Sequence, residues 1–159
     1  MKTATVKTLK TELQHLSQTE LIALCLRLSK FKKENKELLT YLLFEADNEH
    51  QYIATVTQEL HEQFKNINPN SYFYIKKSVR KILRQLKTYA RYSGKKETEI
   101  ELLLFFCKEL KSFKPTIKHN LTLTNLYNRQ IETIKKLITG LHEDLQYDFN
   151  LELEALTTI

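Results

Sequence analysis

The chain has 159 residues, of which 42% are hydrophobic and 28% charged, and it contains only two Gly and two Pro. Glycine-rich phosphate loops, tight β-hairpins and open α/β folds need Gly at positions of positive φ, so this composition excludes them and favours an all-helical protein. The formal net charge is +6, and it is distributed very unevenly along the chain. The length suits one domain, and we expect residues 1–159 to form a single one.

The longest unbroken apolar run, Leu102 to Cys107, has six residues, whereas a bilayer span needs about 20. We therefore expect no membrane-spanning segment. Residues 1–13 place lysines among threonines and lack a continuous apolar stretch, so they do not read as a secretory signal. The sequence predicts a cytoplasmic protein.

Both cysteines, Cys25 and Cys107, occur inside apolar helical runs. Two isolated thiols of this kind are most often small core hydrophobes, and we expect both to be buried. A reactive thiol and a disulfide are the alternatives. Neither cysteine has a neighbour at ligand spacing, so the sequence predicts no zinc site.

The amino-terminal third contains three apolar segments. A stripe of Val6, Leu9, Leu13 and Leu16 predicts a short amphipathic helix. Ser17 and Glu20 have the spacing of a capping box, which predicts a second helix from Gln18 towards Lys30. The charged residues 30–36 indicate its end or a bend. Residues 38–44 are apolar on more than one face, so we expect them to be central to the core.

The rest of the chain has clear helix boundaries. Asp47 or Asn48 can cap a helix that ends at residues 66–70, where Pro69 interrupts the pattern. Ser71 can cap a long helix, and Gly94 can end it in a left-handed conformation. Further helices are predicted over 97–113, 120–139 and 142–156. The first of these three includes the run 102–107, a further core candidate. About seven helices in total fit a compact bundle or a short stack of helical hairpins.

Two strings of the sequence resemble a functionally uncharacterised bacterial all-helical family, a domain of unknown function. They are LQHLSQTELIALCLRLSKFKKENKELLTYLL at 13–43 and SVRKILRQLKTYARYSGKKETEIELLLFFCKEL at 78–110. In that family a Leu-x-x-Leu-Ser-x-x-Glu-Leu-Ile helix is followed by a basic helix and then an apolar one. The resemblance implies an all-helical fold over most of the chain, and it brings no activity or catalytic residues.

The charge is concentrated in two segments. Residues 71–96 contain nine Lys or Arg and no acid, whereas residues 141–159 contain five acids and no Lys or Arg. On a helical wheel the apolar residues of the long helix occupy one arc, and the cations occupy the opposite arc. The predicted binding residues on this basic arc are Lys77, Arg80, Lys81, Arg84, Lys87 and Arg91. Phe73, Tyr74 and Tyr92 flank them.

This basic arc has several interpretations. It can be a solvated helix face, or the acidic carboxyl-terminal segment can fold back on it and pair with it. It can also bind an acidic protein surface, or it can bind nucleic acid or anionic lipid without sequence specificity. The leading hypothesis is a non-enzymatic interaction protein that binds an acidic macromolecular partner through this face, and nucleic-acid binding is the alternative. The sequence does not determine the oligomeric state.

Catalytic and metal-binding patterns are weak. Glu12 with His15, and Asp47 with His50, have the Glu/Asp-x-x-His spacing found in di-metal helical bundles. His15 lies opposite the apolar stripe of its helix, and Asp47 is a predicted cap, so we expect no metal and no cofactor. No strand-turn-helix context exists for a nucleophile elbow. An enzyme with a motif-free site in a helical cleft is the second alternative, and the sequence favours a protein that is not an enzyme.

Overall fold

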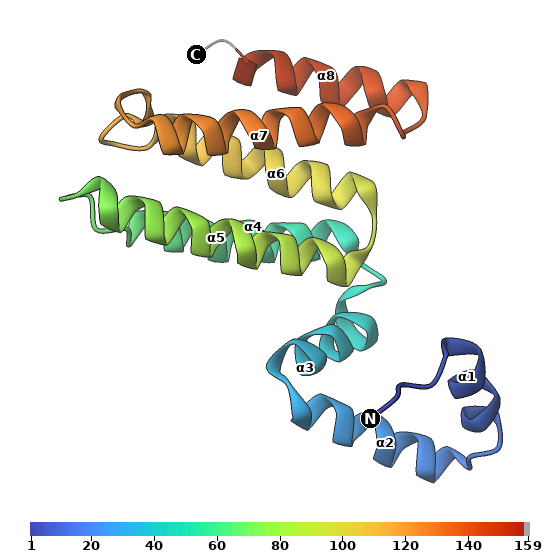
Figure 1. Cartoon of the computed structure of the whole chain (residues 1–159). Helices are drawn as coiled ribbons and strands as arrows, with labels where there is room; N and C mark the ends of the chain where they lie inside the picture. Colours follow the sequence, from blue (N-terminus) through green and yellow to red (C-terminus); the bar gives the residue numbers. More distant parts are fainter. Residues whose placement is uncertain (158–159) are drawn as a thin grey trace. The chain divides into compact units, whose positions relative to one another are not determined.

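The computed structural model describes residues 1–157, and these residues contain eight α-helices, one π-helical turn and one 3₁₀ turn, with no strand (Figure 1). The predicted all-helical fold is confirmed. The chain divides into two compact units, Met1–Phe44 and Glu45–Ile159. Whether the whole chain forms one domain stays a prediction. Within residues 1–157, no helix is both long and apolar enough to cross a bilayer.

The first unit contains helices α1 (Val6–Gln14), α2 (Gln18–Phe31) and α3 (Lys33–Thr40). The capping box is present, because the Ser17 amide donates to a Glu20 carboxylate oxygen at 2.7 Å and the Glu20 amide donates to Ser17 Oγ at 3.3 Å. These bonds favour the carboxylate and hold the pKa of Glu20 below its ordinary value. Lys32 has extended backbone, with φ −141° and ψ 146°, and separates α2 from α3. The charged stretch is thus a break, which gives eight helices where seven were predicted.

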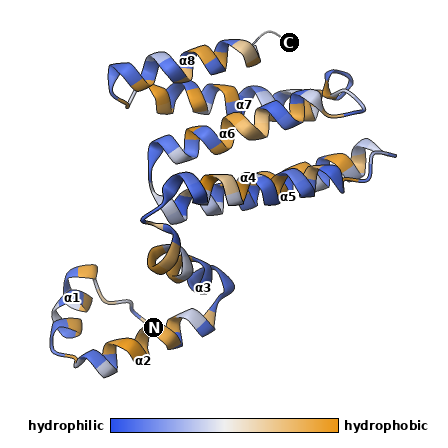
Figure 2. Ribbon diagram, turned by 180° about the vertical axis from the view of Figure 1, so that it is seen from behind, coloured by the Kyte–Doolittle hydropathy of each residue, from blue (hydrophilic) through white to orange (hydrophobic). Residues whose placement is uncertain are grey.

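Most apolar residues of the first unit are exposed. None of the residues of α1, α2 or α3 is buried, and Figure 2 shows many hydrophobic residues along α2. The predicted central role of residues 38–44 is wrong, because Leu42 is 57% exposed and Phe44 is 75% exposed. The predicted burial of Cys25 is also wrong. Three short helices have too little surface to enclose side chains that point in several directions.

The second unit begins within the π-helical turn η1 (Tyr41–Glu45) and is a bundle of five α-helices. They are α4 (Glu49–Lys65), α5 (Tyr72–Ser93), α6 (Lys96–Ser112), α7 (Leu121–Ile138) and α8 (Glu143–Thr157), with the 3₁₀ turn η2 (Ile117–His119) before α7. Helix α6 packs against α4, α5, α7 and α8. The predicted core run is confirmed, since Leu102, Leu103, Leu104, Phe106 and Cys107 are at most 1% exposed.

The predicted helix boundaries of this unit are confirmed at their caps. Asn48 Oδ1 accepts from the amide of Gln51 at 3.1 Å, and Ser71 Oγ accepts from the amide of Phe73 at 3.2 Å. Gly94 has φ 68° and donates its amide to the Ala90 carbonyl at 2.9 Å. A left-handed residue at this position would be strained with any β-carbon.

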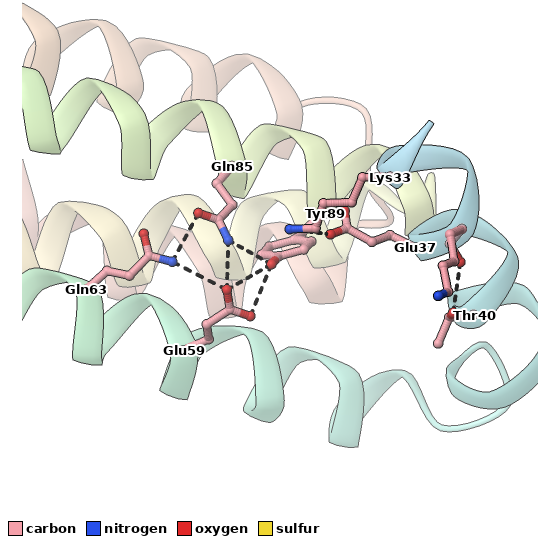
Figure 3. Close-up of polar contacts among 8 residues, drawn as sticks. Lys33, Glu37, Thr40, Glu59, Gln63, Gln85 and Tyr89 are labelled. Atoms are coloured by element: carbon pink, nitrogen blue, oxygen red, sulfur yellow. Dashed lines mark hydrogen bonds and ion pairs between the residues drawn. The ribbon is translucent and has the colours of Figure 1, made fainter. Parts of the chain in front are cut away.

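A polar network fixes α4 against α5 (Figure 3). Tyr89 donates its hydroxyl to both carboxylate oxygens of Glu59, at 2.9 and 3.0 Å. Gln85 donates to Glu59 at 2.7 Å and to the Tyr89 hydroxyl at 2.8 Å, and Gln63 donates to Gln85 Oε1 at 3.0 Å. Because these side chains hydrogen-bond to one another across the two helices, the network adds to the packing of α4 against α5.

Candidate functional site

The apolar side of α5 is anchored in the bundle as the wheel predicts. Ile75, Val79 and Leu86 are fully buried, and Ile82 and Ala90 are 2% and 5% exposed. These residues recur every three or four positions, so they occupy one side of the helix and determine which side faces outward. The opposite side is therefore held in a fixed orientation on the surface of the second unit.

We call the six predicted binding residues of α5 the basic face. All of them are exposed: Lys77, Arg80, Lys81, Arg84, Lys87 and Arg91. Within residues 1–157, none of the six forms an ion pair with an acid. Arg91 donates only a long hydrogen bond to Thr88 Oγ1, at 3.4 Å.

The acidic carboxyl-terminal segment does not cover the basic face. Its five acids lie on α8, and α8 packs against α6 and α7. Glu152 of α8 forms an ion pair with Lys108 of α6 at 2.8 Å. Lys111 of α6 also donates to the Ala155 carbonyl at 3.0 Å. The α8 end is therefore attached to α6, and its acids form no ion pair with α5.

The flanking aromatic residues lie at the two ends of the basic face. Phe73 and Tyr74 are 66% and 49% exposed and contact each other edge-on, with ring centroids 5.5 Å apart. Tyr92 at the other end is half-buried and packs on Tyr89 at 6.1 Å between centroids. Only the pair at the amino-terminal end of α5 is thus presented to solvent.

A groove of about 1090 Å³ runs between α5 and α7, which both lie alongside α6 (Figure 1). Two cations of the basic face, Arg80 and Lys87, belong to its α5 wall, and Arg129 and Lys136 belong to its α7 wall. Leu83, Leu121 and Leu126 supply apolar surface, and Thr122, Asn125, Asn128 and Thr133 supply neutral polar groups. The lining contains one acid, Glu132, and it is paired with Lys135 at 2.8 Å.

Gln130 also lines this groove and contains an unpaired acceptor. The side chain is 5% exposed, and its Nε2 donates to the Leu126 carbonyl at 3.1 Å. Its Oε1 is buried and has no hydrogen-bond partner. Exchanging the two amide atoms would place two oxygens against each other, so the unpaired atom is the oxygen. A buried unpaired carbonyl is costly, and such groups are uncommon in native proteins.

Sequence reasoning missed the α7 wall of the groove. Residues 97–140 combine seven cations with five acids, so their small net charge hides a local pattern. A signal was nevertheless present: Thr122, Asn125, Arg129, Thr133 and Lys136 recur every three or four positions and form one polar stripe on α7.

The candidate metal residues do not converge. Glu12, His15, Asp47 and His50 are all exposed. Among the residues that the structure describes, no group of three or more His, Cys, Asp or Glu side chains could hold a metal ion. His61 instead contacts Glu109 across α4 and α6, at 3.1 Å between Nδ1 and Oε1.

A separate acidic region surrounds Glu101 of α6. Burial raises the pKa of Glu101 above its ordinary value, and the nearby carboxylates of Glu152, Glu49 and Glu97 raise it further, whereas His50 acts in the opposite sense. Glu49 itself accepts from Lys95 at 2.9 Å, from Thr98 at 2.6 Å and from Ser93. Glu49 of this region is therefore already paired with residues between the end of α5 and the first turn of α6.

Comparison with family models, with curated proteins and with solved structures yields no match to this chain.

Proposed function

We propose that this chain is a non-enzymatic interaction protein that binds an acidic partner protein through the basic face of α5. The observation that carries the proposal is the exposure of six cations on one fixed helix face, with no acid of residues 1–157 paired to them. Like charges at this spacing destabilise a helix by about 0.2–0.5 kcal/mol per pair. An acidic partner would relieve that repulsion and add charge-assisted hydrogen bonds.

We place this activity in the cytoplasm, where two unpaired cysteines are stable. The resemblance to a bacterial helical family agrees with an all-helical interaction protein and adds no chemistry to the proposal. The proposal therefore depends on the surface of α5 alone.

Nucleic-acid binding is the second candidate, and the exposed pair Phe73 and Tyr74 favours it. Bases stack on aromatic rings, and adjacent cations hold phosphates. Binding to DNA or RNA should weaken steeply with salt because bound counterions are released.

The test is a charge reversal on the basic face. Replacing Arg80, Arg84 and Arg91 by Glu changes the charge on the exposed side of α5, away from the buried side chains. We expect the far-ultraviolet circular dichroism to be preserved, since exposed substitutions usually change stability by about 0.5 kcal/mol or less. Capture of partner proteins from the source cell, after nuclease treatment, should be lost.

Two controls distinguish the outcomes. Replacing the same three residues by Lys preserves the charge and should preserve capture. If nuclease removes all capture by the wild-type chain, nucleic-acid binding replaces the protein partner. If the reversed chain folds and captures the same proteins as the wild type, the basic face is only solvated and the proposal is wrong.

A further inference from the structure

The groove between α5 and α7 contains features that a solvated basic helix does not need. Both walls supply cations, Arg80 and Lys87 from one and Arg129 and Lys136 from the other. Three leucines also line the groove, and the buried Gln130 Oε1 has no partner. These three features come from two helices that are separate in sequence, and they converge in one hollow.

We infer that this groove binds a segment of the partner protein that carries acidic and apolar side chains together. The inference rests on the proposed function and gives it a location and a ligand chemistry. Carboxylates of the segment contact the cations of both walls, and its apolar side chains cover the three leucines of the lining. One N–H of the segment donates to Gln130 Oε1 once this side chain turns toward the groove.

The unpaired oxygen favours a ligand with N–H donors over a simple anion. Phosphate and carboxylate groups that are fully ionised only accept hydrogen bonds, so they would leave Gln130 Oε1 unpaired. A peptide supplies N–H donors along its backbone. Pairing this buried oxygen on binding would remove a cost that the free protein bears.

The lining also favours a peptide over nucleic acid. Groove-lining residues include no aromatic side chain, and single-stranded nucleic acid is usually held by stacking on such rings. Leu83 and Leu126 are half-buried, and Leu121 is 76% exposed. Apolar side chains of a peptide can bury aliphatic surface of this kind away from water, and this burial favours binding. The volume of about 1090 Å³ is at the upper end for small-molecule pockets, which suits several side chains.

The basic face supplies a matched pair of variants for the test. Arg80→Glu with Lys87→Glu changes two cations of the groove wall, and Lys77→Glu with Lys81→Glu changes two cations of the same helix outside the groove lining. Both double variants alter the net charge by the same amount. A third double variant, Arg129→Glu with Lys136→Glu, changes the α7 wall, which is not part of the basic face.

The probe is a short fluorescein-labelled peptide composed of Glu and Leu, and binding is measured by fluorescence anisotropy. We expect the two groove-wall variants to weaken binding by about tenfold or more, and the Lys77/Lys81 variant to weaken it by less than about threefold. A peptide in which Ser replaces Leu should bind more weakly to the wild-type chain. An oligothymidylate of equal charge should not compete better than the peptide.

Gln130→Leu tests the unpaired oxygen at constant charge. It should weaken peptide binding while leaving the salt dependence unchanged, because it removes an acceptor and no cation. Thermal unfolding controls for folding, and Gln130→Met serves as a second variant that keeps the side-chain length. Unchanged affinity in a folded Gln130 variant would overturn the role of this residue.

The experiment distinguishes a failure of the groove inference from a failure of the proposed function. If both α5 double variants weaken binding equally and the α7 variant has no effect, the groove inference is wrong and the basic face remains the binding surface. If no variant weakens binding, or if the wild-type chain does not bind the peptide, both are wrong. Stronger binding of oligothymidylate would replace the peptide segment by nucleic acid.

Discussion

The contribution of an apolar residue to the stability of this fold depends on how many helices enclose it, and not on its hydrophobicity alone. Leu103 and Leu42 both lie in apolar runs, and Leu103 is fully buried on α6, whereas Leu42 is 57% exposed in η1. Leu103→Ala should reduce the free energy of unfolding by about 2–5 kcal/mol, from lost burial and a residual cavity. Leu42→Ala should reduce it by about 1 kcal/mol or less. Chemical denaturation measures both, and equal losses would contradict this assignment of the core.

Glu101 provides a pH-dependent test at the same scale. Its pKa is raised in the folded chain, so the folded state favours the protonated carboxyl and loses stability as the pH rises through that raised pKa. Glu101→Gln should therefore raise the thermal midpoint at neutral pH, and the difference should vanish in acid, where the wild-type carboxyl is protonated. Glu154→Gln, at an exposed position of α8, is the control. A midpoint that falls at neutral pH would show that the charge of Glu101 stabilises the fold.

Among the helices, α7 donates one buried hydrogen bond to the end of α8. Tyr127 of α7 is fully buried, and its hydroxyl donates to the Leu156 carbonyl at 2.8 Å. Tyr127→Phe should cost about 1–3 kcal/mol, because the buried carbonyl of Leu156 loses its donor. Amide exchange near residues 150–157 should accelerate if the end of α8 is released.

Tyr127 also makes the attachment of α8 sensitive to alkali. Burial raises the pKa of Tyr127 to about 12 from an ordinary value of 10.0, and the nearby Cys107 contributes in the same direction. Stability from the protonated hydroxyl is complete below pH 10.0 and is lost as the pH approaches 12. The Phe variant should therefore lose less stability than the wild-type chain over this interval. Parallel loss in both chains would assign the alkaline sensitivity to other groups.

Helix ends could be predicted from sequence because the interactions that form them are local. The caps at Ser17, Asn48 and Ser71, and the left-handed Gly94, each involve residues within a few positions of one another. The packing side of α5 followed from its period for the same reason. The groove could not be predicted, since Arg80 and Arg129 come together only through the packing of α5 and α7 beside α6.

At the scale of the whole molecule, the two units differ in how much they enclose. Residues 38–44 have the same apolar character as residues 102–107, yet only the latter are surrounded by four other helices. Sequence periodicity reports which side chains are apolar and cannot report how many neighbours are available to cover them. The core prediction was therefore right for α6 and wrong for the segment that follows α3.

This difference predicts unequal local stability along the chain. The first unit has 44 residues, near the lower limit of about 40 below which domains need disulfides, metals or association. Its helices α1, α2 and α3 contain no buried residue, whereas α6 contains eight. Because local opening is least costly where few apolar contacts are lost, amides of α1–α3 should exchange with solvent faster than those of α6. Hydrogen exchange followed by mass spectrometry, on the full chain at several protein concentrations, measures this. Protection of α1–α3 equal to that of α6 at every concentration would show that the apolar side chains of the first unit are covered in solution and that the predicted difference does not exist.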